Sequence, residues 1–230
     1  MKKGLVNIKW NYIEDLSNED ISYFLFLEGK SIEVISKIRG LETSEVQRHI
    51  IEGKIKYRLL SKSNNIEELF HSIATAGKQD KLRVLNSLDD KTKQEILKFV
   101  KDRYIQMSSK DKEAAVWIVG ELRDVNSKGI LIKGSVHKSF NVRRLSVSAI
   151  GKLQDKDLEM TLIRALDDSN PQVVTYAIGS LAKIKGKKAK EKIESLKAKS
   201  DKAYIIRAAD KYLETIDEEN LGIKKEEFEV

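Results

Sequence analysis

A short motif that recurs about every 30 residues constrains the fold of this chain more than any other feature of its sequence. Residues 116–122 (VWIVGEL) align with residues 147–153 (VSAIGKL), a third copy spans 176–181, and a weaker fourth copy spans 207–213. A period of this length holds two helices, and a single helical hairpin cannot bury its apolar face alone. We therefore expect an all-α fold in which the hairpins stack into a short solenoid.

Glycines set the register of this alignment. Gly120 and Gly151 are 31 residues apart, and Gly179 follows after a further 28 residues. We expect small residues such as Ala149, Gly151, Ala177 and Gly179 to let neighbouring helices approach closely. The second helix of each hairpin is expected between the copies of the motif, at 130–136, 158–166 and 189–196.

The turns between the repeats carry a family resemblance. The stretch 165–173 (ALDDSNPQV) is similar to the inter-repeat turn of the short HEAT-like repeats named after phycobilisome lyases, and residues 141–144 (NVRR) resemble the start of the preceding repeat. The resemblance covers about residues 110–217 and implies a right-handed α-solenoid. Such repeats serve as binding scaffolds in many pathways. Some relatives act on bilin chromophores, but this chain has no cysteine and nothing else supports that activity.

Composition agrees with a helical, non-membrane protein. One proline and 12 glycines in 230 residues leave little turn chemistry for a β-sandwich or barrel. The absence of cysteine excludes disulfides, thiolate metal sites and a cysteine nucleophile. The N-terminus does not resemble a signal peptide, and no apolar run approaches the roughly 20 residues that span a bilayer. We expect a cytoplasmic protein with no membrane partner.

A helix-turn-helix pattern precedes the repeats. Ser31 is a good N-cap for a short helix, and Gly40 suits the tight turn that follows it. A third helix is expected from Thr43 onward. Its inner side is expected to carry the apolar residues Val46, Ile50, Ile51 and Ile55. Residues 32–50 resemble the helix-turn-helix of sigma-factor region 4 and of related response-regulator domains.

This second resemblance implies that the third helix lies in the major groove of duplex DNA. Gln47 would read adenine, and Arg48 would read guanine or a phosphate. The opposing interpretation is a three-helix cap that closes one end of the solenoid, because Glu42, Glu45 and Glu52 place negative charge on or near the reading helix. The candidate nucleic-acid-binding residues are Thr43, Ser44, Gln47 and Arg48, with Lys37 and Arg39 on the preceding helix.

Positive charge is concentrated in the repeats. The chain has a net charge of +7, and residues 111–200 carry 18 basic against 11 acidic side chains. Stacked repeats can align such side chains into a ridge that binds a phosphate backbone, although we favour the simpler interpretation of a solvated loop and helix face. The candidate ridge residues are Arg143, Arg144, Lys152, Lys183, Lys187 and Lys188.

Catalytic chemistry finds no support in the sequence. The histidines His49, His71 and His137 are widely separated and lack the spacing of metal ligands. Adjacent carboxylates occur at helix junctions, where capping explains them. We therefore expect no enzyme, no catalytic residue, no metal or other cofactor, and no small-molecule substrate.

The sequence thus divides into four expected parts. A helix-turn-helix-like unit spans 1–61, linking helices span 62–110, HEAT-like repeats span 111–217, and an acidic tail spans 218–230. Two functions remain open. The first is a DNA-associated regulatory or accessory protein that recruits another protein on its repeats. The second is a protein–protein adaptor in which the N-terminal unit only caps the solenoid.

Overall fold

The computed structural model describes residues 3–8 and 10–226, and it describes side chains as far as residue 218. Within this part the regular elements are all helices, which confirms the all-α prediction. The chain forms two compact units, Met1–Phe99 and Val100–Val230. None of the helices in the described part is long and apolar enough to cross a membrane.

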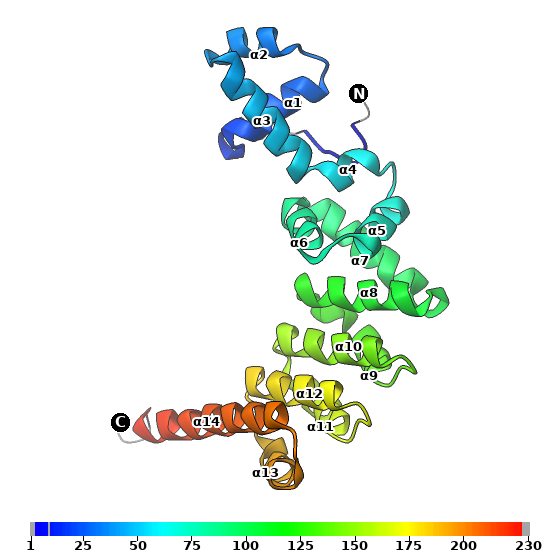
Figure 1. Ribbon diagram of the computed structural model, residues 1–230, viewed down its shortest axis with the longest axis vertical. Coiled ribbons are helices and arrows are strands. Elements are labelled where there is room, and N and C mark those ends of the chain that lie inside the picture. The colour runs from blue at the N-terminus through cyan, green and yellow to red at the C-terminus, as the bar shows by residue number, and fades with distance from the viewer. Residues whose placement is uncertain (1–2, 9, 227–230) are drawn as a thin grey trace. The chain divides into compact units, whose positions relative to one another are not determined.

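The first unit holds the helix-turn-helix and the helices that follow it (Figure 1). After a 3-10 turn (η1, Trp10–Asp15), its helices are α1 (Asn18–Leu27), α2 (Ile32–Arg39), α3 (Thr43–Lys56), α4 (Arg58–Lys62), α5 (Ile66–Thr75), α6 (Lys78–Ser87) and α7 (Asp90–Arg103). The last of these continues into the second unit.

Helix boundaries in the first unit follow from capping. The hydroxyl groups of Ser17 and Ser31 accept hydrogen bonds from backbone amides in the first turns of α1 and α2, at 3.2 and 3.3 Å. Asn65 caps α5 in the same way, at 2.9 Å. Gly40 ends α2 in the left-handed conformation with φ of 63°, as expected for the turn glycine.

The core of the helix-turn-helix forms where α3 crosses α1. Val46 and Ile50 of α3 are buried, together with Ile35 of α2. Gly53 of α3 allows the ring of Tyr23 on α1 to lie against the helix backbone, because a Cβ atom at this position would come within 2.2 Å of the Tyr23 ring. The inner face of α3 is therefore centred on its glycine.

The second unit is a two-row stack of helices, which confirms the expected solenoid (Figure 1). Neighbouring members of the row α8, α10, α12 and α14 pack side by side, and α9, α11 and α13 form the other row. The bounds are α8 (Ser109–Glu121), α9 (Lys128–Ser135), α10 (Phe140–Leu153), α11 (Glu159–Ala165), α12 (Pro171–Lys183), α13 (Lys190–Lys199) and α14 (Ala203–Glu226). Short 3-10 turns join them, at η2 (Tyr104–Gln106), η3 (Val125–Ser127), η4 (Lys156–Leu158) and η5 (Lys187–Ala189).

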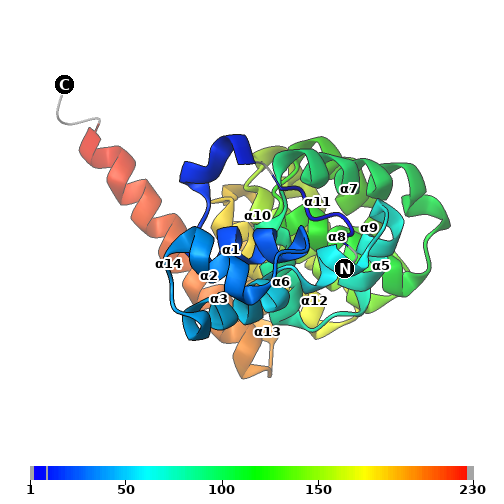
Figure 2. The ribbon, with the colours of Figure 1, turned by 90° about the horizontal axis from the view of Figure 1, so that it is seen from above.

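The C-terminal helix α14 is longer than the other repeat helices and extends beyond them (Figure 2). The acidic tail expected at 218–230 begins inside this helix. The side chains of residues 219–226 and the whole of residues 227–230 lie outside the part of the chain that the structure describes.

Backbone geometry gives the repeat register directly. Arg123, Gln154 and Lys185 follow α8, α10 and α12, and each adopts a left-handed conformation with φ between 50° and 56°. These residues are spaced 31 residues apart, so the true period is 31. By this register Ala182, rather than Gly179, is equivalent to Gly120 and Gly151. The sequence alignment of the third copy was therefore displaced by one turn of helix.

Gly179 also differs from Gly120 and Gly151 in its packing. A Cβ atom on Gly120 would lie 2.6 Å from the Cβ of Ala149, and one on Gly151 would lie 2.5 Å from the Oγ of Ser180. Both glycines lie at close contacts between successive repeats, which confirms the expectation for Gly151. A Cβ on Gly179 would meet nothing within 4 Å, so the same prediction is wrong for Gly179.

Candidate protein and nucleic-acid interfaces

Helix α3 presents one face to solvent. Thr43, Ser44 and Gln47 are exposed at its N-terminal end, where a reading helix would meet the edges of DNA bases. Its first turn receives no side-chain cap from Glu42. The residues named from the resemblance are thus accessible on one helix end.

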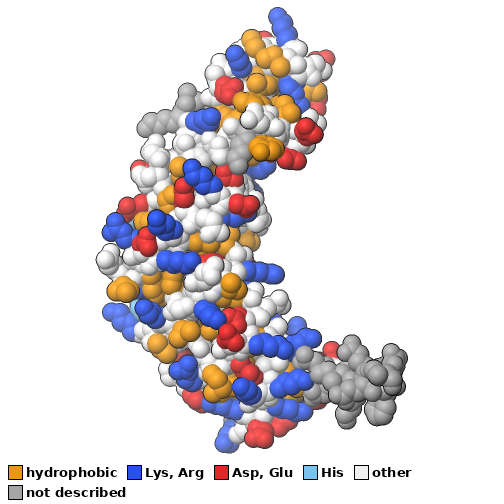
Figure 3. All heavy atoms as spheres, turned by 180° about the vertical axis from the view of Figure 1, so that it is seen from behind, with side chains coloured by type: hydrophobic (Ala, Val, Ile, Leu, Met, Phe, Trp, Pro, Cys, Tyr) orange, Lys and Arg blue, Asp and Glu red, His pale blue; other side chains and the backbone are white. Residues whose placement is uncertain are grey.

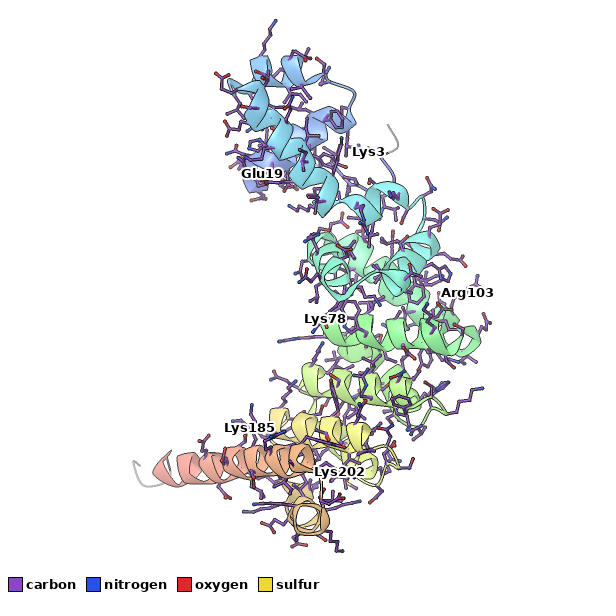
Figure 4. All side chains as sticks on the ribbon, in the orientation of Figure 1. Lys3, Glu19, Lys78, Arg103, Lys185 and Lys202 are labelled. Carbon is purple, nitrogen blue, oxygen red and sulfur yellow. The ribbon has the colours of Figure 1, made fainter. Side chains whose placement is uncertain are left out.

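The cation on this face is surrounded by acids. Arg48 forms an ion pair with Glu52 at 2.9 Å and lies 3.9 Å from Glu45 and 4.0 Å from Glu19 of α1. Glu19 is labelled in Figure 4. A hydrogen bond involving its own backbone and one from Ser17, together with nearby positive charge, lowers the pKa of Glu19. Glu19 therefore stays charged and opposes a DNA phosphate near Arg48.

The two basic residues expected on α2 differ in their environment. Lys37 is exposed. Arg39 instead joins α2 to α1, since its guanidinium donates hydrogen bonds to the backbone oxygen of Asn18 at 3.0 Å, to its side-chain oxygen at 2.6 Å, and to the hydroxyl of Ser22 at 3.0 Å. Arg39 is engaged in holding the two helices together.

Two isoleucines on α3 face outward rather than inward. Ile51 is 57% exposed and Ile55 is 51% exposed, which corrects the expectation that both lie on the inner side of the helix. The inner side is taken by Val46, Ile50 and Gly53. The outer face of α3 therefore combines two apolar side chains with the arginine that is surrounded by carboxylates.

The net charge around α3 agrees with this local arrangement. Residues 18–56 carry six basic and seven acidic side chains, which leaves a net charge of −1. Duplex DNA attracts proteins chiefly through positive charge placed near its phosphates. The helix-turn-helix lacks such an excess.

In the repeats, Arg143 braces the fold. Its guanidinium donates two hydrogen bonds to the carboxylate of Asp168, at 2.6 and 2.9 Å, and two more to the backbone oxygens of His137 and Lys138. The side chains of the pair are only 17% and 8% exposed. Burial tends to raise the pKa of Asp168, but hydrogen bonds from Arg143 and the Asn170 amide lower it overall. Arg143 is thus occupied by internal partners.

The other candidate ridge residues fall into two groups. On the outer face of α10 and α12, the guanidinium of Arg144 lies 5.2 Å from the centre of the Tyr176 ring, and Lys152 pairs with Glu121. Lys183 is exposed at the end of α12. Lys187 and Lys188 lie instead in the turn η5 after Lys185, which Figure 4 labels. Lys and Arg side chains are also spread over the face of the repeats that Figure 3 shows.

A pocket of about 500 Å³ lies between α10, α12 and α14. Lys183 is the one candidate ridge residue in its lining, which also includes Ser148, Tyr176, Gly179 and Lys211. Sequence reasoning missed this pocket. Ser148 and Gly179 are equivalent only in the 31-residue register, and that register was established from the left-handed residues after the helices and not from the sequence alignment.

The histidines and carboxylates in the part of the chain that the structure describes form no metal-binding cluster. Among the described residues, no group of three His, Asp or Glu side chains could hold a metal ion. His49 is buried and hydrogen bonds the hydroxyl of Ser22 at 3.1 Å. This histidine has a structural role in the α1–α3 contact.

A stack of helical hairpins that follows a helix-turn-helix defines a class of proteins that act mostly as binding scaffolds rather than as catalysts. Comparison with known families gives a match in each of two parts of the chain. Residues 130–214 match HEAT repeats, and residues 18–105 match a helix-turn-helix domain. The chain therefore carries the two modules that its sequence resembles.

Among solved structures, the crystal structure of an engineered protein is similar, with a TM-score of 0.51. The two chains are 13% identical, and the similarity covers 88% of this chain and 98% of the other. At this identity the likeness shows the fold alone. No curated protein matches the sequence.

Proposed function

We propose that this chain is a non-enzymatic protein-binding scaffold whose helix-turn-helix unit docks on another protein through the outer face of α3. The observation that carries the proposal is the composition of that face. Ile51 and Ile55 are both more than half exposed, and the nearby cation Arg48 is balanced by three carboxylates. Exposed apolar side chains on a rigid helix are typical of protein interfaces, not of surfaces that follow a phosphate backbone.

The charge around the isoleucines indicates what kind of surface would fit. Ile55 lies beside Glu52 in one surface pocket and beside Lys54 and Arg58 in another. Electrostatic complementarity favours a partner with an apolar centre and a rim that carries charges of both signs. We therefore propose a partner surface of that composition.

A second candidate function is association with duplex DNA. It is favoured by the match of residues 18–105 to a helix-turn-helix domain and by the exposure of Thr43, Ser44 and Gln47 at the start of α3. In this case α3 would lie in the major groove, and Gln47 and Arg48 would contact bases or phosphates.

Two measurements on the full chain separate these functions. The first is duplex DNA binding, followed by fluorescence anisotropy at about 50 and about 200 mM salt to detect counterion release. The scaffold proposal predicts no micromolar binding at the lower salt. Micromolar binding that falls steeply with salt and is lost in Arg48→Glu with Gln47→Ala would establish DNA association instead.

The second measurement is affinity capture from a lysate of the source cells with three versions of the chain. Proteins retained by the wild type and by Lys133→Glu, an exposed site on the repeats, but lost with Ile51→Asp, are expected on the proposal. Equal retention by Ile51→Asp would place the docking surface elsewhere and refute the role of α3. Circular dichroism on each variant checks that the helices are intact.

A further inference from the structure

The pocket between α10, α12 and α14 arises from a gradient of side-chain size along one row of the solenoid. In the 31-residue register, Trp117, Ser148 and Gly179 occupy equivalent positions in three successive repeats. The first repeat fills this position with an indole ring, the second with a hydroxymethyl group, and the third with hydrogen alone. The open space at Gly179 follows, since a Cβ there would meet no atom within 4 Å.

The lining of the pocket suits one bulky apolar side chain. Tyr176 presents its ring with 42% of the residue exposed, and the guanidinium of Arg144 lies 5.2 Å from the centre of that ring. Ala182 and Ala208 add small apolar groups from α12 and α14. Aromatic and aliphatic walls of this kind bind apolar side chains, and fixed rings give contact area at low entropic cost.

Positive charge at the pocket is not neutralised internally. Lys183 and Lys211 both line it, and neither ammonium has a carboxylate partner among the side chains that the structure describes. The equivalent residue one repeat earlier, Lys152, does have such a partner in Glu121. Within the same described part, the Nε atom of Arg144 is buried without a hydrogen-bond partner.

From this combination we propose that the pocket between α10, α12 and α14 binds a short acidic peptide segment of a partner protein. One bulky apolar side chain of the segment fills the space at Gly179, and flanking carboxylates pair with Lys183 and Lys211. The proposal extends the scaffold function to a second surface, but it does not depend on the docking face of α3. Charged hydrogen bonds between ammonium and carboxylate groups fix the register of the peptide.

A nucleic-acid strand fits this surface less well than a peptide does. A phosphate backbone needs an extended track of available cations. Here Arg143 is bound by Asp168, and Lys152 is bound by Glu121. Lys183 and Lys211 instead line a single pocket that also holds the ring of Tyr176, and this arrangement matches one anchored side chain between acidic neighbours.

The test uses the full chain and a fluorescein-labelled peptide of about ten residues, in which Phe-Leu is flanked on both sides by Asp-Glu pairs. Binding is followed by fluorescence anisotropy at about 50 mM salt. We expect a dissociation constant in the range of tens to hundreds of micromolar, as for short peptides on preformed pockets. Gly179→Trp is expected to weaken binding at least tenfold, because it restores the side chain that Trp117 supplies in the first repeat.

Matched controls separate pocket filling from a general effect of substitution. Gly129 of α9 also has no atom within 4 Å of a built Cβ and lies outside the pocket, so Gly129→Trp is expected to leave binding unchanged. Lys183→Glu with Lys211→Glu is expected to abolish binding, whereas Lys133→Glu with Lys138→Glu, on exposed sites elsewhere, is expected to change it less than threefold. Gly179→Leu serves as a smaller filling residue if Gly179→Trp alters the melting curve.

Four outcomes would overturn the proposal. Equal binding of a peptide with Ser-Ser in place of Phe-Leu would leave only general charge attraction. Tighter binding of a labelled oligonucleotide that Gly179→Trp abolishes would assign the pocket to nucleic acid. Unchanged peptide binding in Gly179→Trp would place the peptide elsewhere. The Ile51→Asp variant keeps the pocket, so loss of peptide binding in that variant would assign the peptide to α3.

Discussion

The two glycines that sequence alignment treats as equivalent respond oppositely to the same substitution. In Gly151→Ala the new methyl group would lie 2.5 Å from the Oγ and 2.9 Å from the Cα of Ser180. Ser180 cannot move away easily, because its hydroxyl donates a buried hydrogen bond of 2.9 Å to the backbone oxygen of Val147. In Gly179→Ala the methyl group meets nothing within 4 Å.

These geometries translate into opposite changes in stability. Overpacking at a tight contact costs about 3 kcal/mol at the upper end of its range. Replacing a helical glycine by alanine returns about 1 kcal/mol through helix propensity. The free energy of unfolding should therefore fall by about 2 kcal/mol in Gly151→Ala and rise by about 1 kcal/mol in Gly179→Ala.

Urea unfolding followed by circular dichroism at 222 nm measures this difference. With a slope of about 2.5 kcal/mol per molar urea, the two midpoints should differ by about 1 M. Gly129→Ala, another open helical glycine, is expected to behave like Gly179→Ala. A midpoint for Gly151→Ala at or above that of Gly179→Ala would refute both the close contact and the 31-residue register.

Four further predictions concern three contacts. Arg143→Met should lower the free energy of unfolding by about 2–3 kcal/mol, measured by urea titration, because it leaves the carboxylate of Asp168 without its charged donor. Since the folded-state pKa of Asp168 is lowered, its contribution is present above the unfolded value of about 3.9 and disappears as the pH falls through the folded value. Acid titration should thus destabilise the wild type more than Asp168→Asn. Tyr57→Phe removes the hydroxyl that donates a 3.0 Å hydrogen bond to buried Asp20, and thermal melting should show a loss of about 1–2 kcal/mol. Ser180→Ala leaves the Val147 oxygen short of one donor, and a loss of about 1 kcal/mol is expected in the same assay.

The sequence predicts the solenoid well because its information is periodic. Apolar and small residues repeat along α8, α10 and α12, and each hairpin has to bury its face against the next. The register of the third copy is harder to predict. The residues that follow these helices in the left-handed conformation are Arg123, Gln154 and Lys185. None of them is a glycine, asparagine or aspartate, the types from which a positive φ can be predicted.

The exposure of Ile51 and Ile55 on α3 could not be predicted from the sequence, for a different reason. Helical spacing alone assigns Ile50, Ile51 and Ile55 to one broad apolar side. The structure centres the buried side on Gly53, because the ring of Tyr23 needs the space of a missing side chain there. That choice turns Ile51 and Ile55 outward. A glycine selected by an aromatic ring on another helix cannot be recognised from the spacing within α3.

The constant 31-residue interval also makes the length of this array an adjustable quantity. Removal of one complete interval between Arg123 and Gln154 would join α8 to the turn that now follows α10, with the same backbone conformation at the junction. Gly120 of α8 would then face Ser180 of α12 in place of Ala149 of α10. Serine and alanine are both small, so the close contact between the helices could be kept. Duplication or loss of whole intervals can therefore change the reach of the scaffold in fixed steps while the contact between neighbours keeps its shape.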